Sequence, residues 1–395
     1  MSDARTQLAR HLKKLSAEIG ARPIGSAPNQ AAADYIRDQF RAAGLEVEEH
    51  PYACTDWECS AISLEIEGKR TFAAANVFSL PCDVTAPVMP LCSSAELESA
   101  PVTGNILLLY GDLANHPLSP KSWFLKSERD DKIIQLLEAK RPAALLAPPA
   151  ATVEYEQVTE DWELDIPAAT IAPETALALI NQPGASAHLR TESRRIPATA
   201  RNIVARKAGR NGKKVVLMAH FDTKINTPGA TDNAGGTAAL LWLAESFRDA
   251  DLPFGLEFVA FNGEEYLPIG DDEYLRRGES EFGQILLAVN FDGAGAALGT
   301  CNITDFNASP ELHALVDEQA KRHPAVIWVD PWPESNHSTF AFRGVPALAL
   351  SSTGVRAIAH SPADTIEQAS PAKLADSAQL VEEIVGKLGE MSNKK

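Results

Sequence analysis

The sequence predicts an α/β protein: a three-layer α/β/α sandwich with a mostly parallel central sheet, plus an inserted, mostly β domain. Two observations predict this architecture. From residue 200 onward, apolar runs of strand length alternate with helical patterns, as in parallel sheets whose strands are joined by covering helices. Residues 54–195 instead contain short strand-like runs separated by prolines. We therefore expect one layered domain that is interrupted by a separate β-rich domain.

Two helices and one strand are expected before the insertion. In the first helix, apolar residues recur at helical spacing at Leu8, Leu12, Leu15 and Ile19. A second helix is expected in "QAAADYIRDQFRAAG" before Gly44, and "LEVEEHPY" alternates like a strand. Because these elements would complete the layers of the C-terminal half, that domain is predicted to be discontinuous. The predicted domains are 1–53 together with 196–395, and 54–195.

The insertion is expected to hold four short strands and a helix. The strands are "AISLEIEG", "NILLLYG", "AALLAPP" and "PAATIAP", and the helix, between the second and third strands, is "DDKIIQLLEAK". No cluster of histidines and acidic residues occurs in this region of the sequence. We therefore expect the chemistry to reside in the other domain.

The C-terminal half is expected to alternate strands and helices. The predicted strands are "KKVVLMAHFD", "FGLEFVAFNGEE", "ILLAVNFDG" and "VPALALSS". The predicted helices lie in "AGGTAALLWLAESFRDA", "DDEYLRRGES", "SPELHALVDEQAKRH" and "SPAKLADSAQLVEEIVGKLGEM".

Composition narrows the classes of partner. The 395 residues include 36 Lys and Arg against 53 Asp and Glu, a net charge of −17, which argues against nucleic acid or an anionic membrane surface as a partner.

We expect neither a signal peptide nor a membrane span, because there is no long apolar run. The five cysteines lack a close pair, so reduced thiols and a cytoplasmic location are expected. The sequence leaves open whether the chain forms homo-oligomers.

Potential metal ligands follow the predicted strands. In an open α/β sheet, ligands bind outside the carboxyl ends of the strands. Four strand ends here lead into such residues, and a Gly-rich turn adds Asp232; the strand-end residues are His220, Asp222, Glu264, Glu265, Asp292, His360 and Asp364.

Two histidines with several carboxylates and no cysteine are typical of a catalytic zinc site, or of a similar divalent site, rather than a structural one. Beside a metal-binding glutamate, the neighbouring glutamate could act as general base on a bound water. Asp222, two residues from His220, is placed to hold that imidazole in one tautomer. Two ions bridged by one carboxylate would use His220, Asp232, Glu265, Asp292 and His360.

The segments "AHFDT", "GATDNAGG", "FNGEEY", "NFDGAG" and "AHSPADT", in this order and spacing, resemble the dinuclear zinc aminopeptidases of the bacterial leucyl aminopeptidase and aminopeptidase Y type. That family also includes glutamate carboxypeptidase and the transferrin receptor. The resemblance covers roughly residues 200–370, and "IGARPIGSAPNQAAADYIRDQFRAAGLEVEE" resembles the family's N-terminal segment. The insertion is similar to a protease-associated domain in "TGNILLLYG", "DKIIQLLEAKRPAALLAP" and "IPAATI".

The resemblance implies a function and a role for each site residue. The implied function is removal of N-terminal residues from peptides with a free N-terminus, with two zinc ions as cofactors. Asp232 would bridge the ions, Glu265 and His360 would bind one of them, and His220 and Asp292 the other. Glu264 would be the general base, and Asp222 the catalytic acid that orients His220.

The chain departs from the family pattern at three places. "YLPIGDDEY" replaces a Gly-Leu-x-Gly-Ser stretch, Ser335-Asn336-His337 replaces Ser-Asp-His, and Ile358-Ala359 stand where a tyrosine is common. We consider His337 a loop hydrogen-bonder or a substrate contact, and Arg356 a candidate partner for a substrate carboxylate. Three alternatives stay open: a carboxypeptidase, a single-zinc enzyme like glutaminyl cyclase, and a non-catalytic, receptor-like binding protein of the same fold.

Overall fold

The computed structural model describes residues 3–123, 126–149 and 159–392. The chain divides into two compact units, Met1–Cys54 with Thr199–Lys395, and Thr55–Ala198. The domain boundaries predicted from the sequence lie after residues 53 and 195. Two long strands, β1 (Glu46–Ile66) and β8 (Ser186–Lys207), run from one unit into the other, so continuous strands rather than loops lead into the second unit. We call the first unit the sandwich unit and the second the insert unit.

The sandwich unit is built on a mostly parallel sheet with the strand order β13-β12-β14-β11-β9-β10-β8, which confirms the predicted fold class. The strands β10 and β11 flank β9, and both run parallel to it, as β14 does to β11. The strand β8 runs antiparallel to β10, and β12 runs antiparallel to β14 and parallel to β13. Besides β8, the strands are β9 (Lys214–His220), β10 (Gly255–Phe261), β11 (Ile285–Phe291), β12 (Cys301–Phe306), β13 (Val326–Trp328) and β14 (Ala347–Ser351).

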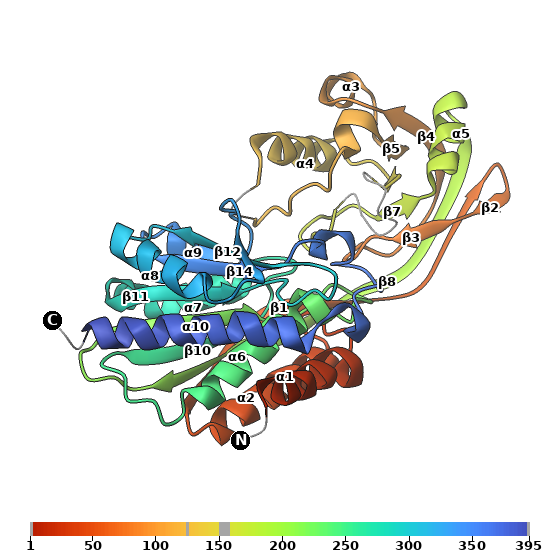
Figure 1. Cartoon of the computed structure of the whole chain (residues 1–395). Coiled ribbons are helices and arrows are strands. Elements are labelled where there is room, and N and C mark those ends of the chain that lie inside the picture. Colours follow the sequence, from red (N-terminus) through yellow and green to blue (C-terminus); the bar gives the residue numbers. More distant parts are fainter. Residues whose placement is uncertain (1–2, 124–125, 150–158, 393–395) are drawn as a thin grey trace. The chain divides into compact units, whose positions relative to one another are not determined.

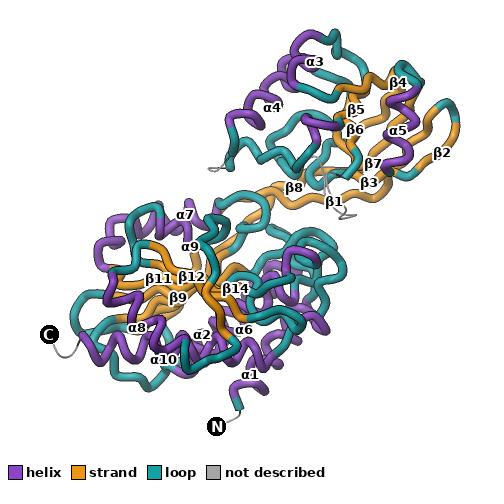
Figure 2. The backbone as a smooth tube through the Cα atoms, turned by 45° about the horizontal axis from the view of Figure 1, so that its top comes forward, coloured by secondary structure: helices purple, strands orange, loops and turns teal. Residues whose placement is uncertain are grey.

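Helices cover both faces of this sheet because its central strands are apolar on both sides. Val215 and Leu217 of β9 pack with α1, α2, α6, α8 and α10, whereas Val216 and Met218 pack with α7 and α9 on the opposite face. Figure 2 shows these two groups of helices on either side of the strands. The helices are α1 (Ala4–Leu12), α2 (Ala27–Ala42), α6 (Gly235–Ser246), α7 (Ile269–Gly278), α8 (Pro310–Ala320), α9 (His337–Ala341) and α10 (Pro371–Ser392).

The start of α6 is held unusually close to the end of β11. A Cβ atom at Gly236 would overlap Asn233 Oδ1 and lie 2.6 Å from the carbonyl oxygen of Phe291. Asn233 bridges the two elements, since its Nδ2 donates to Phe291 O (2.7 Å) and its Oδ1 accepts from Gly236 N (3.0 Å). Glycine at this position therefore allows the helix to begin directly beside the strand end that precedes Asp292.

The insert unit has its own sheet, in which the segment of β8 at residues 186–191 pairs with β4 and the order continues β5-β6-β7-β3. The strands β4 to β7 are parallel, and β2 pairs with β1. Figure 1 labels most of these elements, and Figure 2 also labels β6. They are β2 (Lys69–Thr71), β3 (Ala73–Ala75), β4 (Cys82–Leu91), β5 (Ile106–Leu109), β6 (Ala144–Ala147), β7 (Ala168–Ile171), α3 (Ser94–Ser99), α4 (Glu128–Lys140) and α5 (Pro173–Asn181).

Several elements were not predicted. The insert unit has α3 and α5 in addition to the expected helix α4, and β4 and β8 are also new, as are β12, β13 and α9 in the sandwich unit. The first helix changes character after Leu12 and continues as a π-helix, Lys13–Ile19. Among the described helices, none is both long enough and apolar enough to cross a membrane. Most of the missed elements are short, and periodicity over a few residues is too weak to identify them.

Candidate metal site

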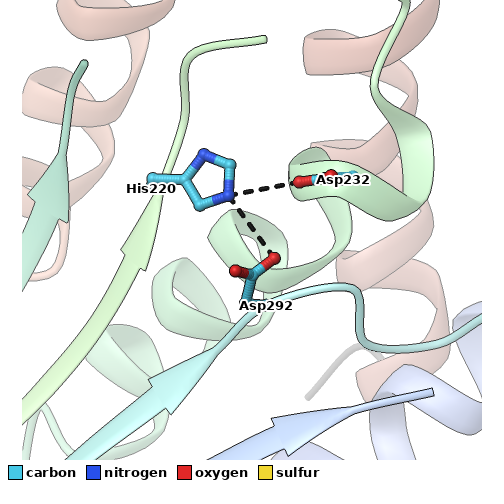
Figure 3. Close-up of side chains that lie close together, drawn as sticks. All are labelled: His220, Asp232 and Asp292. Carbon is cyan, nitrogen blue, oxygen red and sulfur yellow. Dashed lines mark ion pairs between the residues drawn. The ribbon is translucent and has the colours of Figure 1, made fainter. Parts of the chain in front are cut away.

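The strand register brings three predicted ligand segments to one edge of the sheet. His220 is the last residue of β9 and pairs with Phe261, three residues before Glu264. Asn290 of β11 pairs with Met218, so Asp292 follows at the level of His220. Figure 3 shows His220 and Asp292 at the ends of neighbouring strands, with Asp232 beside them.

The first group of potential ligands consists of His220, Asp232 and Asp292. His220 Nε2 lies 3.2 Å from Asp232 Oδ1 and 3.4 Å from Asp292 Oδ1. The imidazole is fully buried. Two ligand atoms bound to one tetrahedral zinc at about 2.0–2.2 Å are roughly 3.3–3.6 Å apart. The spacing of this group is therefore close to that of a zinc site.

The second group consists of Asp232, Glu265 and His360. His360 Nε2 lies 3.2 Å from Asp232 Oδ2 and 3.1 Å from Glu265 Oε2. Asp232 thus belongs to both groups and directs one carboxylate oxygen to each histidine. This arrangement suits a carboxylate that bridges two cations.

Several atoms of the two groups are buried without a hydrogen-bond partner: both ring nitrogens of His220, Asp232 Oδ1 and Glu265 Oε1. Unpaired buried polar atoms are rare in proteins because each costs free energy. A divalent cation would satisfy His220 Nε2 and Asp232 Oδ1, which lie 3.2 Å apart, since imidazole nitrogens and carboxylate oxygens are zinc ligands. The donor set therefore fits a metal site.

The electrostatics of the site also favour positive charge. Burial lowers the pKa of His220, but the carboxylates of Glu264 and Asp292 outweigh burial, and the pKa is raised well above its usual value. Burial would raise the pKa of Asp232, yet the imidazoles of His220 and His360 beside it hold that pKa far below its usual value. The raised pKa of His220 reflects the carboxylates gathered around it, and negative charge of this kind favours a cation at the site.

Glu264 and Asp222 lie beside these groups without belonging to either. Glu264 Oε2 is 4.0 Å from His220 Nε2, and the side chain is 18% exposed. The buried carboxylate of Asp222 accepts hydrogen bonds from the backbone N–H of Glu264 (3.3 Å) and Glu265 (3.2 Å). Its Oδ1 is also 3.6 Å from His220 Nδ1. Asp222 therefore connects the turn that carries both glutamates to the ring of His220.

Asp364, which we counted among the potential ligands, has another place in the structure. It is fully buried and accepts hydrogen bonds from Thr231 N (2.9 Å), Thr231 Oγ1 (2.8 Å) and Asp232 N (3.0 Å). Burial raises the pKa of Asp364 to about 6. It belongs to neither ligand group and holds the backbone of Asp232 in place.

The two candidate substrate contacts differ in accessibility. His337 is fully buried at the start of α9, where Nε2 donates to the carbonyl oxygen of Trp332 (2.7 Å) and the ring packs on Phe306 and Trp332. These contacts match a loop hydrogen-bonder, and burial keeps His337 from touching a substrate in this conformation. Arg356 is 90% exposed, with Nη2 3.7 Å from Glu334 Oε1.

A cavity of about 570 Å³ in the sandwich unit lies away from these groups, beside Lys214 and Gly255 where β9 and β10 begin. No predicted site residue lines it. The candidate site is therefore defined by its side chains at the opposite edge of the sheet.

Comparisons with known proteins identify relatives of this chain. Residues 202–385 match the family model described as "Peptidase family M28". The probable lipoprotein aminopeptidase LpqL of Mycobacterium tuberculosis is 24% identical over 285 residues, which cover 66% of this chain and 53% of LpqL. Aminopeptidase YwaD of Bacillus subtilis is 23% identical, with 94% of this chain and 82% of YwaD covered. The chain thus spans about half the length of LpqL but most of YwaD.

The fold is also found in a solved structure. BSAP, a zinc aminopeptidase from Bacillus subtilis, matches with a TM-score of 0.80 at 21% identity, and the match covers 97% of this chain and 95% of BSAP. At this identity the likeness shows a shared fold.

Proposed function

We propose that this chain, whose residues 202–385 belong to peptidase family M28, is a metal-dependent aminopeptidase that uses two zinc ions. One observation carries the proposal: Asp232 is shared by two groups of potential ligands, each completed by a histidine and a second carboxylate. His220 and Asp292 would hold one ion, and Glu265 and His360 the other. When bound, the ions would supply a water that is nucleophilic at neutral pH and would polarise the scissile carbonyl.

Glu264 would act as the general base. It lies beside both groups but is a member of neither, so its carboxylate stays available to accept a proton and later donate it to the leaving amine. Asp222 would keep the ring of His220 oriented, because its carboxylate is fixed by the two backbone N–H groups of the glutamate turn.

The charge of the site supports recognition of an amine. Six carboxylates gather there and would outnumber the four positive charges of two zinc ions, so the remaining negative charge would attract a protonated α-amine and repel a C-terminal carboxylate. They belong to Asp222, Asp232, Glu264, Glu265, Asp292 and Asp364. The names of the relatives, which are aminopeptidases, support the same choice over the carboxypeptidase alternative. The complete ligand set argues against a non-catalytic receptor.

A peptide library tests the proposal. The purified protein is incubated, with and without a chelator, with peptides that have either free or acetylated N-termini, and products are read by mass spectrometry. Chelator-sensitive loss of single N-terminal residues from the free peptides alone is the expected result. C-terminal trimming would indicate a carboxypeptidase, loss of ammonia from N-terminal glutamine a cyclase, and no change a binding protein.

Narrower parts of the proposal rest on the sequence. We infer a protease-associated-like insert from the resemblance of its segments. The net charge of −17 supports peptides rather than nucleic acid or membrane lipid as partners. The cytoplasmic location stays a prediction.

A further inference from the structure

We propose that Arg22, a residue outside the ligand set, is a positioning residue that sets the distance between His220 and Asp232, and that Asn29 extends this support to the turn carrying Glu264. The inference rests on the proposed metal site, because it assigns Arg22 the task of preparing that site. Both residues belong to the turn-rich segment "RPIGSAPN" near the N-terminus.

The guanidinium of Arg22 ties together the two ends of one loop. Its Nε donates to Phe221 O (2.6 Å), directly after His220. On the other side, Nη1 donates to Pro228 O (2.7 Å) and Nη2 to Gly229 O (3.0 Å), three residues before Asp232. A single planar group therefore fixes where the loop leaves His220 and where it returns toward Asp232.

The same guanidinium is anchored to its own segment. Nη1 also donates to Gly20 O (3.0 Å) and Leu15 O (3.3 Å), and the backbone N–H of Arg22 donates to Thr223 Oγ1 (2.9 Å). The residue is fully buried. Because the rigid fork of arginine presents its donors in fixed directions, it can hold several carbonyls at set positions.

The hydrogen bonds of this guanidinium leave the carboxylates of the metal site free to bind a cation. In the described parts of the chain, each hydrogen bond of the guanidinium ends on a backbone carbonyl oxygen. Asp222, Asp232, Glu265 and Asp364 act on it only through their charge. A guanidinium paired directly with one of these carboxylates would compete with a cation for it, and this geometry avoids that competition.

Asn29 links the same segment to the other side of the site. Its Nδ2 donates to Arg22 O (3.1 Å) and to Asn262 Oδ1 (2.9 Å), and its Oδ1 accepts from Asn262 Nδ2 (2.9 Å). Asn262 follows β10 directly and lies two residues before Glu264. The turn that carries the proposed base is thus joined to the segment that holds the loop between His220 and Asp232.

The test compares Arg22→Lys with the control Arg195→Lys. Arg195, in the insert unit, also donates to backbone carbonyls, those of Phe78 (Nε, 2.7 Å) and Leu164, which lie outside the ligand loops. Lysine keeps the charge but offers three donors from one point. Each protein is loaded with cobalt(II), whose visible spectrum reports ligand number and geometry; metal affinity is measured by chelator competition, and thermal unfolding is recorded.

For Arg22→Lys we expect an altered cobalt spectrum and metal affinity weaker by roughly 10–100-fold, as for other residues that orient metal ligands. Arg195→Lys should lower the unfolding temperature while leaving spectrum and affinity at wild-type values. A wild-type spectrum and affinity in Arg22→Lys, or equal changes in both variants, would overturn the inference.

A second variant tests the same inference if Arg22→Lys does not fold. Asn29→Asp keeps the side-chain shape but removes the donors to Arg22 O and Asn262 Oδ1, and it should also alter the cobalt spectrum. An unchanged spectrum in that variant would overturn the inference. Wild-type protein that binds no cobalt would instead refute the proposed metal site, so the two failures are distinguishable.

Discussion

Replacing Gly236 with alanine separates two opposing effects on stability. Gly236 lies in the first turn of α6, where alanine is favoured by up to about 1 kcal/mol through helix propensity. The new Cβ, however, would overlap Asn233 Oδ1 and come within 2.6 Å of Phe291 O. The net change in stability depends on whether the gain in helix propensity or the steric overlap of the new Cβ is larger.

The close approach should prevail. Forcing a methyl group into a packed interior costs about 1–3 kcal/mol. Asn233 would also lose its bonds to Gly236 N and Phe291 O, at about 1 kcal/mol each. After the gain in propensity, the free energy of unfolding should fall by roughly 2–4 kcal/mol. Because Asn233 and Phe291 are neighbours of Asp232 and Asp292, metal affinity should fall as well.

Urea unfolding followed by circular dichroism measures the first effect, and chelator competition measures the second. Gly386→Ala in α10 is the matched control, because a Cβ there would meet nothing within 4 Å. It should stabilise the protein by up to about 1 kcal/mol. If Gly236→Ala were also stabilising, the argument from close packing between α6 and β11 would be wrong.

Three further predictions follow from the site and its surroundings. Glu264→Gln should keep the fold and the metal content, measured by elemental analysis, while turnover falls by about 10²–10⁴-fold; near-normal turnover with full metal would remove Glu264 from the mechanism. Burial raises the pKa of Asp271 to about 7, so the folded state holds a proton that the unfolded state releases near pH 4, and stability should decline as pH rises from about 4 to 7. Asp271→Asn should lessen that decline in urea unfolding, and parallel curves for both proteins would refute this assignment. Chelation should lower the unfolding temperature and zinc should restore it, since free zinc at about 100 times Kd adds about 2.7 kcal/mol per site; a temperature that chelation leaves unchanged would contradict a metal bound by the folded state.

The positions of the proposed ligands could be anticipated because parallel strands place their carboxyl ends at one edge. His220 and Asp292 each end or follow a buried apolar strand, and such runs are visible in the sequence. The prediction that Asp232 bridges two metals came from the family resemblance alone. In the structure, the position of Asp232 depends on how the loop after His220 folds back toward that residue, and no sequence motif within the loop predicts this path.

The supports of the site could not be anticipated, for a physical reason. Arg22 bonds to carbonyls about 200 residues away along the chain, and backbone carbonyls carry no sequence signal. Asp364 likewise binds the N–H groups of Thr231 and Asp232 rather than taking a place among the ligands. His337 was predicted to be a loop hydrogen-bonder or a substrate contact, and in the structure its ring is buried against Phe306 and Trp332. Burial of this kind is a property of tertiary packing.

The number of zinc ions bound per chain tests the central claim most directly. Elemental analysis of zinc-saturated protein, after removal of unbound metal, should find two ions in the wild type. His220→Ala removes a ligand of one group and His360→Ala a ligand of the other, so each variant should retain one ion. A single ion in the wild type, or two ions in either variant, would contradict a site in which Asp232 bridges two metals.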